Sequence, residues 1–384
     1  MTIRKAVFWL HLAAGVTGGA VILVMSITGV LLMYEKQVTD WADRGYRVSA
    51  SAGAATRLPI ETLLSRVRSL RPALPAAVAL KADGSEPAAF SYGRNSVLYV
   101  DPYTGSILGE GSKSVRAFFQ ATTSWHRWLA QEGSGRATAR AVTGACNLAF
   151  LFLTLSGAYL WLPRRWSWSG VRAVALFRGG LKGKARDFNW HNVAGLWCLV
   201  PLLVIVASGV VMSYPWANRL VYTLAGSAPL AFIGGVGGGP RTGGPPRGEI
   251  DTSGLNELWA RAESETPGWQ SISLRLSGLN GRGTVFTIDR GDGYKPQTRD
   301  TLTLDRRTGA VIRREPFGSG DAGRRLRLWL RFAHTGEYYG AVGQTVAGIA
   351  SAGAALLVWT GLSLALRRFS RWRERRTAPA PAEI

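Results

Sequence analysis

The sequence predicts an integral membrane α-helical protein with four transmembrane helices, arranged in two helix–module–helix repeats that each carry a small α+β module. Two observations predict this class. Four long stretches contain no Asp, Glu, Lys or Arg, and several residues recur at two fixed offsets along the chain. The composition agrees, because 47% of the 384 residues are hydrophobic and only 18% are charged. That is more apolar surface than a soluble domain of this size hides.

Each of the four charge-free stretches exceeds the roughly 20 residues that a helix needs to cross a bilayer core. Their central parts are apolar on every side, which is typical of helices that face lipid. We therefore expect transmembrane helices within residues 6–34, 141–163, 188–218 and 338–366. A fifth charge-free stretch, residues 220–240, ends in Gly and Pro and is typical of a loop or a reentrant segment.

Basic residues near the helix ends predict the orientation in the membrane. Two precede the first helix, seven lie in residues 164–187, and six follow residue 366. These residues all fall on one side of the membrane, which we take to be the cytoplasmic side. Both chain termini are then cytoplasmic, and the two longer connecting segments lie on the outer side.

The predicted domains follow the helices in order. They are helix 1 (1–35), module 1 (36–113), a juxtamembrane helix with helix 2 (114–163), a cytoplasmic loop (164–187), helix 3 (188–218), module 2 (219–322), a juxtamembrane helix with helix 4 (323–366), and a cytoplasmic tail (367–384). Within the modules we expect a short helix at 60–70, hairpin strands at 96–109, 283–290 and 301–312, and a flexible loop at 234–248.

Composition also excludes several functions. A net charge of +22 is typical of nucleic-acid binding, but the basic residues at the helix ends report topology, so nucleic acid is not an expected partner. The two cysteines, Cys146 and Cys198, are too few for a disulfide scaffold, a zinc ribbon or an iron–sulfur cluster.

The recurring residues indicate an internal duplication. A shift of 180 residues places the first helix on the third and pairs His11 with His191, Gly15 with Gly195, and Gly29 with Gly209. A shift of 204 residues places the second helix on the fourth and pairs Asp101 with Asp305, Trp125 with Trp329, Gly144 with Gly348, and Gly157 with Gly361.

The four histidines of the chain divide into two pairs by predicted topology. His11 and His191 lie on faces lined by Gly15 and Gly195, just inside the cytoplasmic boundary, where an ionisable residue faces the bundle. His126 and His334 lie on the outer side, each ahead of a helix that enters the membrane. Two pairs on two faces match the ligands of two bis-histidine b-type haems. The alternative for each helix is close packing around a hydrogen-bonded histidine.

The sequence does not decide which residues would bind the outer haem. Under the shift of 204, His126 meets Leu330, and His334 lies one helical turn later. Met33 and Met212, near the outer ends of the first and third helices, are alternative ligands or packing residues.

Three arginines lie close in sequence to the outer histidines: Arg127, Arg140 and Arg331. They are candidates to bind haem propionates, with ordinary interfacial arginines as the alternative. The remaining positive charge of the outer side suits haem propionates and anionic lipid headgroups.

Several motifs together carry a family resemblance. They are FWLHLAAGVTGGAVILVMSITGVLLMYE at the start, D-P-x-T-G at 101–105 with its echo at 305–309, WHRWL at 125–129, SGAYLWLPRRW and FNWHNVAGLW. Over essentially its whole length the chain resembles the PepSY-associated transmembrane family, also called iron-regulated membrane proteins. Within that family it is similar to ferrioxamine-type ferric siderophore reductases of the bacterial inner membrane.

This resemblance implies PepSY-like periplasmic modules, two haems b, and delivery of electrons to ferric siderophore in the periplasm. Hard oxygen ligands hold Fe(III) better than Fe(II), so reduction releases the iron. Some relatives carry a fused flavin reductase domain, whereas this chain ends soon after its last helix. We therefore expect a separate electron donor, either quinol or a cytoplasmic reductase, and no acid–base catalytic residues. Two other functions stay open, a membrane-tethered module that inhibits or senses a protease, and a siderophore transporter.

Overall fold

The computed structural model describes residues 2–48, 56–93, 95–162, 167–228, 251–277, 279 and 281–377. Four helices in this part of the chain are long and apolar enough to cross a membrane, which confirms the four predicted from the charge-free stretches. They are α1 (Ile3–Leu32), α5 (Gly135–Trp161), α7 (Gly183–Ser213) and α11 (Gly340–Thr377). Helix α7 begins before its charge-free stretch, and α11 continues through much of the basic tail.

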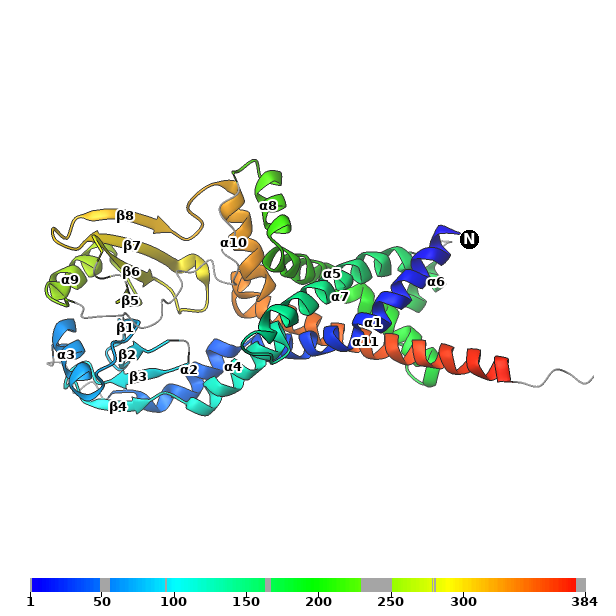
Figure 1. Ribbon diagram of the computed structural model, residues 1–384, viewed down its shortest axis with the longest axis horizontal. Helices are drawn as coiled ribbons and strands as arrows, with labels where there is room; N and C mark the ends of the chain where they lie inside the picture. Colours follow the sequence, from blue (N-terminus) through cyan, green and yellow to red (C-terminus); the bar gives the residue numbers. More distant parts are fainter. Residues whose placement is uncertain are drawn as a thin grey trace, which may run out of the picture.

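The four long helices form a bundle, with the sheet at one end and the N-terminus at the other (Figure 1). Helix α1 packs against α5 and α11, and α7 packs against the same two helices, so α1 and α7 occupy opposite corners. Small side chains allow close contact, as where Ala350 and Ala354 of α11 meet Cys198 and Leu202 of α7.

The strands form one antiparallel sheet in the order β4-β3-β2-β1-β5-β6-β7-β8. The strands are β1 (Ala77–Lys81), β2 (Ala88–Ser91), β3 (Val97–Val100), β4 (Ile107–Glu110), β5 (Ser271–Arg275), β6 (Gly283–Asp289), β7 (Arg299–Asp305) and β8 (Val311–Pro316). Four precede α5 and four follow α7, so the two predicted modules join into a single sheet. The junction pairs β1 with β5, placing Val78 opposite Leu274, and it removes the exposed strand edge that each half would otherwise present.

Two helices cover one face of this sheet. They are α3 (Ile60–Leu70), which confirms the helix expected there, and α9 (Leu255–Glu265). Their apolar sides share one core with alternate strand residues, including the fully buried Phe90 and Phe286. The expected hairpin strands are confirmed as β3–β4 and β6–β7–β8.

The repeated D-x-x-T-G motif forms the turns after β3 and β7. In the first turn the Asp101 carboxylate accepts hydrogen bonds from the backbone amides of Tyr103 and Thr104, and Asp305 does the same in the second turn. Gly105 and Gly309 follow with φ of 71° and 68°, a backbone conformation that favours glycine.

Shorter helices connect the bundle to the sheet. Helix α2 (Glu35–Asp43) follows α1, and α4 (Lys113–Trp128) packs against α1 before α5 begins. Helix α8 (Pro215–Leu224) follows α7, and α10 (Ala322–His334) packs against both α7 and α8. The loop between α5 and α7 contains α6 (Trp168–Ala175), and single 3₁₀ turns lie at η1 (Arg44–Tyr46), η2 (Pro296–Thr298) and η3 (Glu337–Tyr339). The flexible loop expected at 234–248 lies outside the described residues, as does the end of the fifth charge-free stretch.

Candidate functional site

The four histidines lie in two pairs, each contributed by opposite sides of the bundle. His11 of α1 and His191 of α7 stand on helices at opposite corners and are close enough to interact electrostatically. His126 of α4 and His334 of α10 lie at the sheet end, with ring centres 6.5 Å apart and ring planes at 68°. All four histidine residues are half-buried.

Every one of these imidazoles makes the same hydrogen bond, through Nδ1 to a Ser or Thr hydroxyl of a long helix. The four bonds are His11 to Ser156 at 2.8 Å, His191 to Thr360 at 2.9 Å, His126 to Thr28 at 2.9 Å, and His334 to Ser208 at 3.0 Å. The inner histidines on α1 and α7 thus reach across to α5 and α11. The outer histidines on α4 and α10 reach down to α1 and α7.

The direction of these bonds follows from what the hydroxyls do with their own protons. Each hydroxyl donates to the carbonyl four residues earlier in its helix, at 2.6 to 2.7 Å. A hydroxyl has one proton, so its oxygen accepts from the histidine, and Nδ1 must carry a hydrogen. His334 supports this separately, because its Nδ1 also lies 2.8 Å from the Ile205 carbonyl, which only accepts. In a neutral ring of this tautomer the lone pair is on Nε2, the nitrogen then available to a metal.

A glycine follows each of the four hydroxyl residues in the sequence. A Cβ on Gly157 would lie 3.4 Å from Cε1 of His11, and one on Gly361 would lie 3.3 Å from Cε1 of His191. At Gly29 the distance to Cε1 of His126 would be 3.7 Å, whereas Gly209 makes room for Asn147 instead. Three of the four Ser/Thr-Gly pairs therefore hold an imidazole and also leave space for it.

Sequence reasoning missed the hydroxyl partners, although the signal is present. Ser156 and Thr360 are separated by the offset of 204, and Thr28 and Ser208 by the offset of 180. The glycines beside them were recognised as repeated, while the preceding hydroxyl residues were not.

The other predicted site residues have different surroundings. The closest atoms to a Cβ on Gly15 and Gly195 would belong to Leu153 and Leu357, at 3.8 and 3.6 Å. These glycines therefore ease helix packing, and the glycines closest to the inner rings are Gly157 and Gly361.

The alternative ligands Met33 and Met212 are buried. Met33 packs against Gly348, because a Cβ added to that glycine would lie 3.4 Å from the Cγ of Met33. His126 and His334 lie near each other in an edge-to-face arrangement, so both rings are available to one outer site.

The three candidate arginines lie at the same end of the bundle as the outer pair. Arg127 stacks over the Trp128 ring at 4.5 Å, and Arg331 lies 5.3 Å from the Phe332 ring. Arg140 is exposed. The Thr143 hydroxyl donates a hydrogen bond shared by the backbone carbonyls of Arg127 and Arg140.

A family model described as the PepSY-associated TM region matches residues 8–377. The chain belongs to the PepSY-associated transmembrane family. All four histidines and their hydroxyl partners lie inside the matched region. Membership in the PepSY-associated transmembrane family and the four long apolar helices together establish a membrane protein. No curated protein matches the sequence.

Proposed function

We propose that this protein is a di-haem reductase of the bacterial inner membrane that passes electrons to ferric siderophores of the hydroxamate type in the periplasm. The observation that carries the proposal is that the four histidines share one arrangement and one pattern of hydrogen bonding. They lie in two pairs at two levels of the bundle, each with a hydrogen on Nδ1 that is bonded to a hydroxyl. Ligating histidines use their second ring nitrogen in this way.

The residues fit bis-histidine haem. Two imidazoles that bind one metal through Nε2 from opposite sides, with bonds of about 2.0 Å, have ring centres about 6 Å apart. The outer rings are 6.5 Å apart. Glycines leave room for three of the imidazoles to lie close to the helices that hold them. His11 and His191 would hold the inner haem, and His126 and His334 the outer one.

When bound, the haems would supply one-electron carriers near the two membrane faces. The chain sets their spacing, because Thr28 follows His11 by 17 residues, or about 26 Å along a helix. Ser208 follows His191 by the same number. Ile22 and Leu202 lie between these levels and are almost completely buried, so this part of the bundle excludes water. Arg127, Arg140 and Arg331 are placed to meet propionates at the outer level.

The same contacts support two helix–module–helix repeats with the modules in the periplasm. The inner bonds repeat at offsets of 180 and 204, and the outer hydroxyls repeat at 180. The one-turn displacement of His334 relative to His126 does not change its role, because both meet equivalent hydroxyls. The basic residues at the other end of the bundle then lie in the cytoplasm, on the donor side.

The direct test is an optical spectrum of the purified protein with haem quantified per chain. We expect two haems b per chain, a low-spin Soret band that shifts on reduction, and reoxidation of the reduced form by ferric hydroxamates. Protein that lacks haem and binds a protease would instead support a tethered inhibitor or sensor. Siderophore uptake by haem-free vesicles would support a transporter.

Replacing Thr360 by valine tests the hydroxyl bonds. His191 then loses its Nδ1 acceptor, so its ring is less well oriented and is a weaker base. We expect affinity for one haem to fall roughly 10-fold to 100-fold, with a higher potential for that haem. The readouts are haem retention during dilution and a potentiometric titration. Thr17→Val is the matched control, since Thr17 bonds only within its own helix. Equal effects of the two substitutions would contradict the assigned role.

A further inference from the structure

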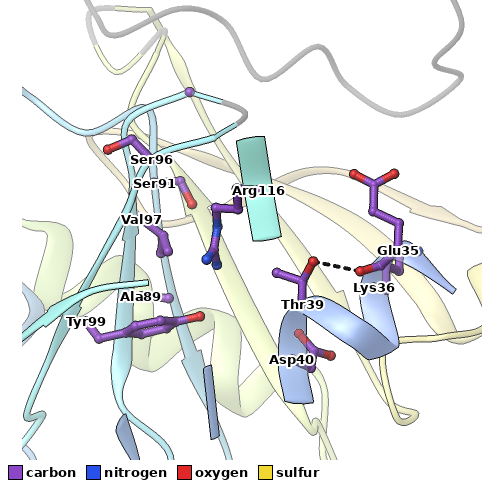
Figure 2. A pocket seen from close by; sticks show the side chains of 11 residues that line it. Glu35, Lys36, Thr39, Asp40, Ala89, Ser91, Ser96, Val97, Tyr99 and Arg116 are labelled. Carbon is purple, nitrogen blue, oxygen red and sulfur yellow. Dashed lines mark hydrogen bonds between the residues drawn. The ribbon is translucent and has the colours of Figure 1, made fainter. Parts of the chain in front are cut away.

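The charged residues are distributed differently at the two ends of the molecule. At the sheet end, the pocket between α2 and the β2–β3 hairpin is lined by two acidic and two basic residues, so the charges of its lining balance (Figure 2). At the opposite end of the bundle, here called the inner end, residues 167–187 and 366–377 contain eleven Lys and Arg but only two acidic residues. The inner end is thus strongly basic over a short length of chain.

Helix α11 continues past the rest of the bundle at the inner end. The start of α7 lies beside it, because a Cβ on Gly183 would be 3.6 Å from the Arg367 guanidinium. From Arg367 the helix runs ten more residues to Thr377, or about 15 Å. The side chains of residues 366–376 are all exposed, and the red end of the helix stands clear of the other elements (Figure 1). This part of α11, the extension, therefore projects from the bundle.

The extension distinguishes α11 from the helix at the offset of 204. That helix is α5, and it ends at Trp161, whose counterpart in α11 is Ala365. Helix α11 continues for twelve residues beyond that point. Orientation in the membrane requires positive charge near the helix ends, but it does not require that the charge stand on a continuing helix. A feature that occurs once suits a partner that binds once per chain.

The arginines of the extension do not lie on one side of it. Arg371 and Arg375 share one side of the helix, whereas Arg373 projects from the opposite side. A helix that lies flat on a membrane presents one broad apolar face to the lipid. Here the two aromatic rings, those of Phe369 and Trp372, stack on each other with centres 5.7 Å apart. The extension is therefore suited to water and to an anionic surface that approaches it from the side.

The basic residues of α7 and α11 meet at Asp187, close to the inner histidine pair. The buried carboxylate of Asp187 accepts a hydrogen bond from the Ser363 hydroxyl at 2.7 Å and pairs with Arg186 and Arg367. Asp187 precedes His191 by four residues, or about 6 Å along α7. The basic surface therefore begins about one helical turn from the inner pair.

Two tryptophans adjoin the inner pair at this surface. Trp190 precedes His191 in the sequence, and Trp359 precedes Thr360, the hydroxyl partner of that histidine. Their ring centres are 6.4 Å apart, and the Arg186 guanidinium lies 5.4 Å from each ring. Trp and Arg are the residue types that most often carry the binding energy of protein interfaces. This part of the surface thus has the composition of a docking site.

The inner basic surface consists of six residues around the start of α7 and along α11: Lys182, Lys184, Arg186, Arg367, Arg371 and Arg375. We propose that it docks an acidic cytoplasmic protein that carries single electrons; the role of this protein as the donor rests on the proposed function. In each encounter the reduced carrier loses one electron, and the iron of the inner haem gains it and changes from Fe(III) to Fe(II). The positive field raises the rate at which an acidic carrier arrives. Quinol, the other donor expected from the sequence, is uncharged and stays in the lipid, so this surface would not attract it.

The test uses flavodoxin, a small acidic protein with one flavin. Binding of its oxidised form, which cannot donate an electron, is measured by fluorescence anisotropy on the full chain in nanodiscs of zwitterionic lipid. We expect Arg371→Glu with Arg375→Glu to raise the Kd about tenfold at low ionic strength. Lys182→Glu with Lys184→Glu should act in the same way. Both effects should disappear in 1 M salt, where the screening length is about 3 Å.

The matched control is Arg307→Glu with Arg325→Glu, which makes the same change of charge at exposed positions of the sheet end. It should leave the Kd unchanged. A second measurement follows the Soret band after the protein is mixed with reduced flavodoxin. The second-order rate constant should fall about tenfold in the two inner variants and stay the same in the control.

The outcomes separate the docking surface from the proposed function. Haem-free protein that binds flavodoxin with this dependence on charge and salt would uphold the surface and remove the reductase. Haem protein whose flavodoxin binding is absent, or is the same in wild type and both inner variants, would overturn the surface and leave the reductase standing. Loss of co-purified anionic phospholipid from the inner variants, with flavodoxin binding unchanged, would assign the surface to lipid headgroups and so also overturn the proposal.

Discussion

We expect replacement of His126 by alanine to lower the haem content from the proposed two per chain to one, and reduction of ferric hydroxamate to fall to the background rate. The reason is that the ring centres of His126 and His334 are 6.5 Å apart and that the two residues share one metal in the proposed site. The pair formed by His11 and His191 contacts other helices, so its haem should remain. The measurements are haem per chain, the reduced spectrum, and the rate of ferrous iron release.

The matched control is Trp125→Ala, which removes an exposed neighbour on the same helix. It should retain both haems. Retention of two haems by His126→Ala would show that the outer ligands were misassigned. Met33→Leu and Met212→Leu would then identify the replacement ligand, since these residues are the alternatives at that level.

Replacing Asp43 by alanine should destabilise the protein by about 3–5 kcal/mol, because it leaves the Arg116 guanidinium buried without its counter-charge. The ion pair fixes α2 to the start of α4, and Tyr99 adds the hydrogen bond that joins both to the sheet. The free energy of unfolding is measured by titrating the full chain with denaturant and digesting it briefly with a protease at each concentration. Cleavage within the sheet reports the fraction that is unfolded there.

Acid should have a related effect. The pKa of Asp43 is lower in the folded protein than in the unfolded chain, where a carboxyl titrates near 3.9. Its contribution to stability is therefore present above that pH and is lost as the pH falls through the folded pKa of Asp43.

Asp83→Asn is the control for Asp43→Ala, since Asp83 is exposed and its carboxylate bonds only to the nearby Ser85. It should change the free energy of unfolding by less than about 0.5 kcal/mol. Equal losses for the two variants would contradict the role of the buried pair.

The parts of the structure that the sequence predicts well depend on local physics. Runs without charged residues predict α1, α5, α7 and α11, because a helix in lipid cannot expose charge. The D-x-x-T-G turns were also visible, because Asp101 and Asp305 cap amides two and three residues ahead, and a glycine follows with positive φ.

Features that depend on distant contacts were not visible. The pairing of β1 with β5 joins residues almost 200 positions apart, and no local pattern specifies it. Serine and threonine in membrane helices commonly bond their own helix carbonyls. Thr28 and Ser208 do so here, and nothing in the local sequence shows that their oxygens also receive a histidine.

The helices that follow α1 and α7 show the same limit. Helices α2 and α8 stand at the repeat offset, and yet only α2 has Asp43, whose counterpart at that offset is Thr223. The buried carboxylate attaches α2 to Arg116, whereas α8 follows α10 through the bond from Arg327 to Asn218. Each helix thus packs on the equivalent helix of its own half, α4 or α10, but through a different polar contact.

The continuous sheet has a mechanical consequence for the whole molecule. Strands β1 and β5 pair over five residues on each side and bind the α1–α5 half to the α7–α11 half outside the bundle. Rocking one half against the other, as alternating access requires, would have to shear or open this ladder. The sheet therefore holds the two halves together, and with them the two histidines of each pair, which come from opposite halves. A frame of this kind suits the electron transfer proposed above, which requires no relative motion of the two halves.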